Sequence, residues 1–144
     1  LLALLPLLAA PVAQAEATSF CKAFQPVLDA ATEGFSAVRG ESLGNDEWRA
    51  TLAVPDTTDC QVYQTTETPA RMRYTCRMTL AGNTDGPAAA AYTEAVRGCA
   101  VMSTFGLFER VWYLKTQMTG VQVSLIQFDQ PEPYINLVVY QADD

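Results

Sequence analysis

The chain has 144 residues, with 16 acidic and 9 basic side chains and a formal net charge of −7. This acidic balance argues against nucleic acid and anionic membrane surfaces as partners, because both attract a positive field. The sequence contains no histidine, which excludes every mechanism that uses histidine as a base, as the partner of a nucleophile or as a metal ligand.

Residues 1–15, LLALLPLLAAPVAQA, have the pattern of a secretory signal peptide. The segment carries no charge, and an apolar run of about ten residues is too short to span a bilayer. It ends in Ala13-Gln14-Ala15, the small-x-small pattern of a signal-peptidase site. We expect this signal to be truncated at its start. Residues 16–144 are then a single α+β domain, periplasmic or secreted, with no membrane span after signal cleavage.

Apolar residues recur at helical spacing over residues 19–39, which predicts a first helix. Ser19 can cap its start and Gly40 can end it. Pro26 lies inside this segment, so the helix is either kinked there or begins there. The following segment, ESLGND at 41–46, is predicted to be a loop.

Alternating apolar and polar residues predict strands at 47–54, 60–65 and 71–80. A second helix begins at Pro87, and its apolar stripe runs through Cys99 to Met102. After a break at 103–106, three more strands follow at 107–118, 121–128 and 134–140. These last strands are apolar on both faces, which places them in the middle of the sheet.

The predicted element order is αβββαβββ. We therefore expect an α+β fold with an antiparallel sheet of about five or six strands and two helices packed on one face. Ala-Val-Arg-Gly occurs at 37–40 and again at 95–98, near the end of each predicted helix. Internal duplication and coincidence in alanine-rich helices both remain open as explanations.

Four cysteines in an exported chain predict two disulfides. Zinc would need closely spaced cysteine pairs or histidines, whereas these cysteines are 39, 16 and 23 positions apart. We favour pairing Cys60 with Cys76 and Cys21 with Cys99. The pairings 21–60 with 76–99 and 21–76 with 60–99 remain open, because all four thiols are expected to point toward the core.

The favoured pairing follows from the register of a hairpin over residues 60–76. If its arms pair about Thr68, Cys60 lies opposite Cys76 and Val62 lies opposite Tyr74 on the inner side. Directly opposed residues have Cα atoms about 4.5 or 5.5 Å apart, a separation that a disulfide can bridge.

The same register places Arg71, Arg73, Arg77 and Tyr63 on the face opposite the core. Arginine forks suit carboxylates and phosphates, so these residues form a candidate docking face on an otherwise acidic protein. The alternative is a solvated face whose arginines pair with neighbours such as Glu47 or Glu109.

No nucleophile elbow, phosphate-binding loop or dinucleotide-binding motif is present in the sequence. The four methionines are dispersed, which favours core packing over copper binding. We expect no catalysis, no cofactor and no metal. The favoured function is a small exported binding domain of the accessory, immunity or inhibitor type, which contacts a protein of the cell envelope. Two alternatives are a carrier of a small apolar ligand between sheet and helices, and a hydrolase built on a carboxylate pair.

Overall fold

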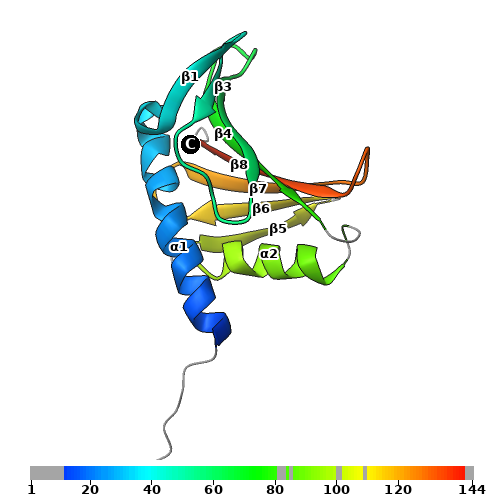
Figure 1. The fold of residues 1–144 in the computed structure, drawn as a ribbon. Helices are drawn as coiled ribbons and strands as arrows, with labels where there is room; N and C mark the ends of the chain where they lie inside the picture. The colour runs from blue at the N-terminus through cyan, green and yellow to red at the C-terminus, as the bar shows by residue number, and fades with distance from the viewer. Residues whose placement is uncertain (1–11, 81–83, 85, 100–101, 109, 142–144) are drawn as a thin grey trace, which may run out of the picture.

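The computed structural model describes residues 12–80, 84, 86–99, 102–108 and 110–141 (Figure 1). One helix precedes four strands, and a second helix precedes four more. The helical elements are α1 (Val12–Ala30), the short 3-10 turns η1 (Ala31–Glu33) and η2 (Ser36–Val38), and α2 (Pro87–Arg97). The strands are β1 (Arg39–Gly44), β2 (Glu47–Ala50), β3 (Thr58–Gln64), β4 (Met72–Thr79), β5 (Met102–Phe108), β6 (Val111–Thr116), β7 (Val121–Phe128) and β8 (Tyr134–Gln141).

The strands form one antiparallel sheet in the order β1-β2-β3-β4-β8-β7-β6-β5. The prediction of an α+β fold with an antiparallel sheet is confirmed. The predicted number of strands was wrong, because the sheet has eight. Strands β4 and β8 lie at the centre of the sheet. They pair over seven residues, from Arg73↔Tyr140 to Thr79↔Tyr134, and so join the two halves of the chain.

The first additional strand is β1, in the segment 39–44 where the sequence indicated the end of a helix and a loop. Asn45 and Asp46 have φ values of 52° and 57°, the left-handed conformation of a tight hairpin turn. This turn pairs β1 with β2 at the edge of the sheet, with two irregularities in register. The strand is almost wholly exposed, so it lacks the apolar alternation by which strands are recognised.

The second additional strand arises because the predicted strand 107–118 was wrong. The structure divides this stretch between β5 and β6, and β5 extends back to Met102, which pairs with Thr116. Residues 103–106 are therefore strand rather than a break, and Met102 does not continue the stripe of the second helix. Pairing with β6 at the sheet edge overrides the local pattern, as tertiary context commonly does for strands.

Helix α1 runs from Val12 to Ala30 without interruption at Pro26, so the alternative in which the helix begins at Pro26 was wrong. Pro26 is exposed, and its neighbours Phe24 and Val27 are fully buried. Packing of these two side chains in the core compensates for the backbone hydrogen bond that proline cannot donate. Residues 1–11 of the predicted signal peptide lie outside the described residues. Residues 12–15 form the first turn of α1, so cleavage after Ala15 would leave residues 16–30 of this helix.

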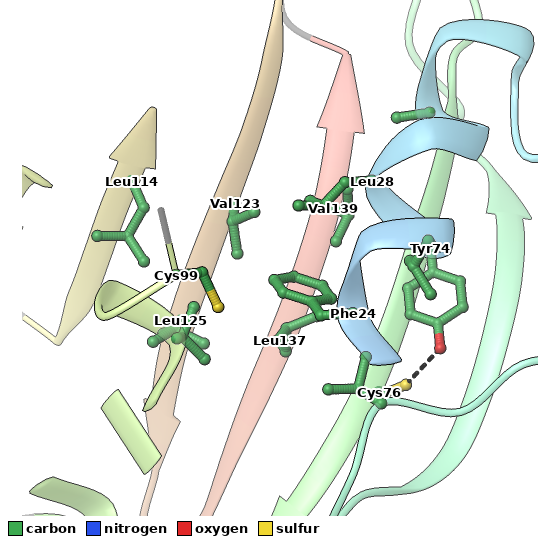
Figure 2. Close-up of a cluster of buried hydrophobic side chains, with 14 of the residues drawn as sticks. Phe24, Leu28, Tyr74, Cys76, Cys99, Leu114, Val123, Leu125, Leu137 and Val139 are labelled. Atoms are coloured by element: carbon green, nitrogen blue, oxygen red, sulfur yellow. Dashed lines mark hydrogen bonds between the residues drawn. The ribbon is translucent and has the colours of Figure 1, made fainter. Parts of the chain in front are cut away.

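The core lies between the helices and one face of the sheet, here called the inner face. In Figure 2, Phe24 and Leu28 of α1 lie against Leu137 and Val139 of β8. Helix α2 contributes Tyr92 to the same core cluster, with its ring 5.8 Å from that of Phe20 at an angle of 90°. Figure 1 shows α1 crossing the sheet and α2 lying beside β5. Within the described ranges, neither helix combines the length and apolar composition needed to cross a bilayer.

Two disulfides link Cys21 to Cys99 and Cys60 to Cys76, the pairing favoured from the sequence. The second closes the β3–β4 hairpin, where the Cα atoms of its cysteines are 4.2 Å apart and Val62 pairs with Tyr74 as expected. The first joins α1 to the segment that follows α2. Disulfides of this kind are typical of proteins that fold in an oxidising compartment.

Candidate functional site

The face of the sheet opposite the core carries the most distinctive set of polar and aromatic side chains. We call it the outer face and define it by the alternate paired positions of strands β2, β3, β4, β6, β7 and β8. Its residues are Glu47, Arg49, Gln61, Tyr63, Arg73, Thr75, Arg77, Thr79, Val111, Tyr113, Lys115, Gln122, Ser124, Ile126, Phe128, Tyr134, Asn136, Val138 and Tyr140.

Among the described residues, no helix contributes a buried side chain to the outer face. The buried apolar residues of α1 and α2 belong to one cluster with inner-face residues such as Leu125 and Leu137. Val138 is only 5% exposed on the outer face but does not belong to that cluster. Val138 is therefore buried outside that cluster, and the outer face is a surface distinct from the core.

The charge of the outer face is opposite in sign to that of the whole chain. Its paired positions contain four cations, Arg49, Arg73, Arg77 and Lys115, against the single acid Glu47, a net charge of +3. The complete chain carries −7. Four of the nine basic residues of the chain and one of its 16 acids thus lie at these positions. Two further acids, Glu67 and Glu132, lie beside Arg73 and Arg77.

Arg77 belongs to a stack of side chains that crosses three strands. Its guanidinium carbon lies 4.1 Å from the centroid of the Tyr134 ring. On its other flank, Tyr134 stacks with Phe128 at 4.8 Å and an interplanar angle of 14°. Cation–π and aromatic stacking of this kind restrict the side chains that take part, so Arg77 is held in place although it is exposed.

Arg73 forms a parallel arrangement at the other end of β4. Its guanidinium lies 5.5 Å from the centroid of the Tyr140 ring and 3.5 Å from a carboxylate oxygen of Glu67. The hydroxyl of Tyr140 donates to Gln122 at 3.1 Å and accepts from Ser124 at 3.3 Å. This network orients Tyr140, and through it Arg73.

Of the four residues of the candidate docking face, Tyr63, Arg73 and Arg77 lie in β3 and β4, and Arg71 lies one residue before β4. Tyr63 pairs with Arg73 across β3 and β4 as expected, and Arg77 follows on the same face. Arg71 precedes β4; its backbone N–H donates to Thr65 Oγ1 at 3.0 Å and its carbonyl accepts from Thr65 N at 2.7 Å. Arg71 therefore lies at the base of the hairpin loop, one residue before β4 begins.

The anticipated cross-strand partners of the arginines differ from those observed. Glu47 lies opposite Tyr63, and Glu109 lies outside the described residues. The acid beside Arg73 is Glu67, from the hairpin loop. Sequence reasoning also missed the aromatic partners Phe128, Tyr134 and Tyr140, because the pairing of β4 with β8 joins residues about sixty positions apart, a separation at which local patterns carry no information.

A groove of about 220 Å³ opens beside Arg77. It is lined by Arg77, Thr79, Pro131, Glu132, Pro133 and Tyr134. Within the described chain, the guanidinium of Arg77 has no carboxylate within ion-pairing distance. Arg77 therefore lines the groove without an ion-pair partner among the described residues.

A larger groove of about 500 Å³ lies between α2 and the ends of β6 and β7. Its polar groups are largely bonded to one another. Arg110 donates to Thr84 at 2.8 Å and to the backbone oxygen of Gln127 at 3.3 Å, and it pairs with Asp129 at 2.8 Å. These contacts join three connecting segments, so Arg110 acts as a structural tie.

Two buried tyrosines, Tyr74 and Tyr92, have raised pKa values. Burial raises the pKa of Tyr74 well above its ordinary value, and a backbone hydrogen bond partly opposes that shift. Burial also raises the pKa of Tyr92, with the charges of Tyr74 and Asp56 adding to the effect. Within the described part of the chain, no group of three or more cysteine or carboxylate side chains converges in a way that could hold a metal ion.

Comparison with protein-family models, with curated proteins and with solved structures finds no match to this chain.

Proposed function

We propose that the protein is a non-catalytic binding domain of the cell envelope, periplasmic or secreted, which binds an acidic segment of another protein on its outer face. The observation that carries this proposal is the concentration of four cations on one sheet face of a chain with net charge −7. The two disulfides support an oxidising compartment.

The composition of the outer face supports a protein partner. Arginine and tyrosine are enriched where proteins bind one another, and they dominate the residues that contribute most to affinity. Here Arg73 and Arg77 are each stacked on a tyrosine of β8. A partner would meet side chains that are already ordered, which lowers the entropy lost on binding.

The distribution of charge selects an acidic partner and orients it. An acidic segment is attracted by the four cations at the paired positions of the outer face, where Glu47 is the one acid, and repelled by the acidic remainder of the chain. Complementary potentials of this kind increase association rates and fix orientation more than they increase affinity.

The two alternative functions gain less support. A carrier of an apolar ligand needs an apolar space between sheet and helices, whereas the groove beside α2 places three charged side chains beside Trp112 and two alanines. A carboxylate hydrolase needs two acids converging in one cleft. The acids of that region, Glu94 and Asp129, are each paired with an arginine.

Site-specific photo-crosslinking tests the proposal. A photoreactive benzoylphenylalanine replaces Phe128 of the outer face, and in a matched variant it replaces Lys22, an exposed residue of α1. In the cells that produce the protein, we expect a discrete protein adduct from position 128 that Arg77→Gln diminishes, and none of the same mass from position 22. Equal adducts from both positions, or none from position 128, would contradict outer-face docking.

A further inference from the structure

We propose that the groove beside Arg77 is a carboxylate-binding site, which receives a glutamate or aspartate side chain from the acidic segment of the partner. This inference rests on the docking function proposed above and names its anchor. The site consists of the six residues that line the groove, with Arg77 as the group that binds the carboxylate.

The chain already contains one arginine that stacks on a tyrosine and also contacts a carboxylate. At one end of β4, Arg73 lies over Tyr140 and a carboxylate, that of Glu67, sits 3.5 Å from its guanidinium. At the other end, Arg77 lies over Tyr134 in the same manner. No acid of the described chain completes this second arrangement. In the proposed complex, a carboxylate of the partner takes the corresponding position beside Arg77.

The position of Arg77 over Tyr134 leaves its guanidinium able to bind a carboxylate. The guanidinium carbon of Arg77 lies over the Tyr134 ring, 4.1 Å from its centroid, and Tyr134 is itself supported by Phe128. Stacking uses the face of the guanidinium and leaves the N–H groups on its edge available for a bidentate bond to a carboxylate.

The size and walls of the groove favour a side chain over a larger ligand. A volume of about 220 Å³ is below the range of about 300–1,000 Å³ found for drug-sized ligands. Pro131 and Pro133 supply stiff walls, since proline has a fixed φ. A segment that crosses the outer face would place one acidic side chain in this groove.

The charge of the lining favours a carboxylate over a phosphate. Glu132 shares the groove with Arg77, so the lining carries one cation and one acid. Arg77 can match the single charge of a carboxylate, whereas the lining offers no second cation for the second charge of a phosphate. Glu132 thus limits the affinity for any anion, and its neutralisation should strengthen binding.

The test measures binding of a fluorescein-labelled, capped nonapeptide of alternating glutamate and glycine, with a glutamine–glycine peptide as the neutral control. Anisotropy is recorded with the disulfide-bonded chain at about 0.01 M salt, where screening is weak. We expect Arg77→Gln to weaken binding about tenfold through loss of charge-assisted hydrogen bonds. Arg77→Lys should weaken it about threefold, because lysine lacks the planar fork.

Two further variants separate a specific site from a general charge effect. Lys22→Gln changes the net charge by the same amount as Arg77→Gln but lies on α1, so we expect it to leave the affinity within about twofold. Glu132→Gln should strengthen binding about twofold to threefold by removing a like charge. Circular dichroism and the midpoint of thermal unfolding verify that every variant is folded.

Other results would contradict either the carboxylate site or the docking function. Equal effects of Arg77→Gln and Lys22→Gln, or competition by inorganic phosphate at lower concentration than by acetate, would overturn the carboxylate site. If outer-face crosslinks persist in that case, docking stands and only its proposed anchor fails. Loss of the crosslinks from position 128 would remove the docking function itself.

Discussion

Tyr134 of β8 lies between Arg77 of β4 and Phe128 of β7, with the Arg77 guanidinium 4.1 Å and the Phe128 ring 4.8 Å from the centroid of its ring. The three residues come from neighbouring strands of the central sheet. Their contacts tie the ordering of the outer face to the pairing of β4 with β8.

Replacing Tyr134 tests whether its ring or its hydroxyl is important. Tyr134→Leu removes both stacking contacts and should lower the free energy of unfolding by about 1 kcal/mol, the magnitude of one aromatic or cation–π contact. Tyr134→Phe keeps the ring and should stay within about 0.5 kcal/mol of the parent. Urea denaturation of both variants gives the comparison. Equal losses in the two would show that the hydroxyl, not the stack, stabilises this part of the sheet.

The two disulfides should differ in their contribution to stability. Cys21 and Cys99 are 78 positions apart, and Cys60 and Cys76 are 16 apart. In the chain-entropy model, loops of these sizes correspond to about 4.5 and about 3 kcal/mol. Paired alanine substitutions at each bridge, followed by denaturant unfolding, should therefore show the larger loss for Cys21–Cys99. The reverse order would show that the local packing of the β3–β4 hairpin outweighs loop closure.

Removing the hydroxyl group should change the stability of the protein in opposite directions at the two buried tyrosines. Tyr74 donates to the backbone oxygen of Leu52 at 2.7 Å, and Tyr74→Phe should destabilise the protein by about 1 kcal/mol. The Tyr92 hydroxyl is buried with no hydrogen-bond partner in the described structure, and Tyr92→Phe should stabilise by about 1 kcal/mol because it removes that desolvation penalty. Calorimetric midpoints of both variants, each compared with the parent, measure the contrast. A lower midpoint for Tyr92→Phe would mean that this hydroxyl is satisfied in solution.

The same two tyrosines predict a loss of stability at alkaline pH. Burial raises the pKa of both Tyr74 and Tyr92 in the folded chain. A folded-state pKa above the unfolded value of about 10 means that the unfolded state loses its protons first as pH rises. The stabilisation is fully present below about pH 10 and is lost progressively above it. Urea midpoints between about pH 8 and pH 11 should therefore be flat and then fall. The fall should be smaller in Tyr92→Phe, and an identical fall in that variant would exclude Tyr92 as a cause.

Local patterns predicted those elements whose burial alternates along the chain. Strands at 60–65, 71–80, 121–128 and 134–140 all have counterparts in the sheet, because each alternates or runs apolar against a buried core. The register of the hairpin was also predictable, since two cysteines and the inward direction of Val62 admit few pairings. Exposed β1 and edge strand β5 were missed, because their backbone pairing rather than their side chains makes them strands.

The chemical content of the protein could be read from the sequence: a segment with the pattern of a signal peptide, four cysteines suited to two disulfides, no histidine, and arginines at alternate positions of one predicted strand. Only the folded structure shows which side chains contact those arginines. The pairing of β4 with β8 places Tyr134 and Tyr140 beside Arg77 and Arg73, although more than fifty residues separate them in the chain. Such contacts depend on which strands become neighbours in the sheet, and strand order follows from burying the whole inner face against α1 and α2, which no local window of sequence contains.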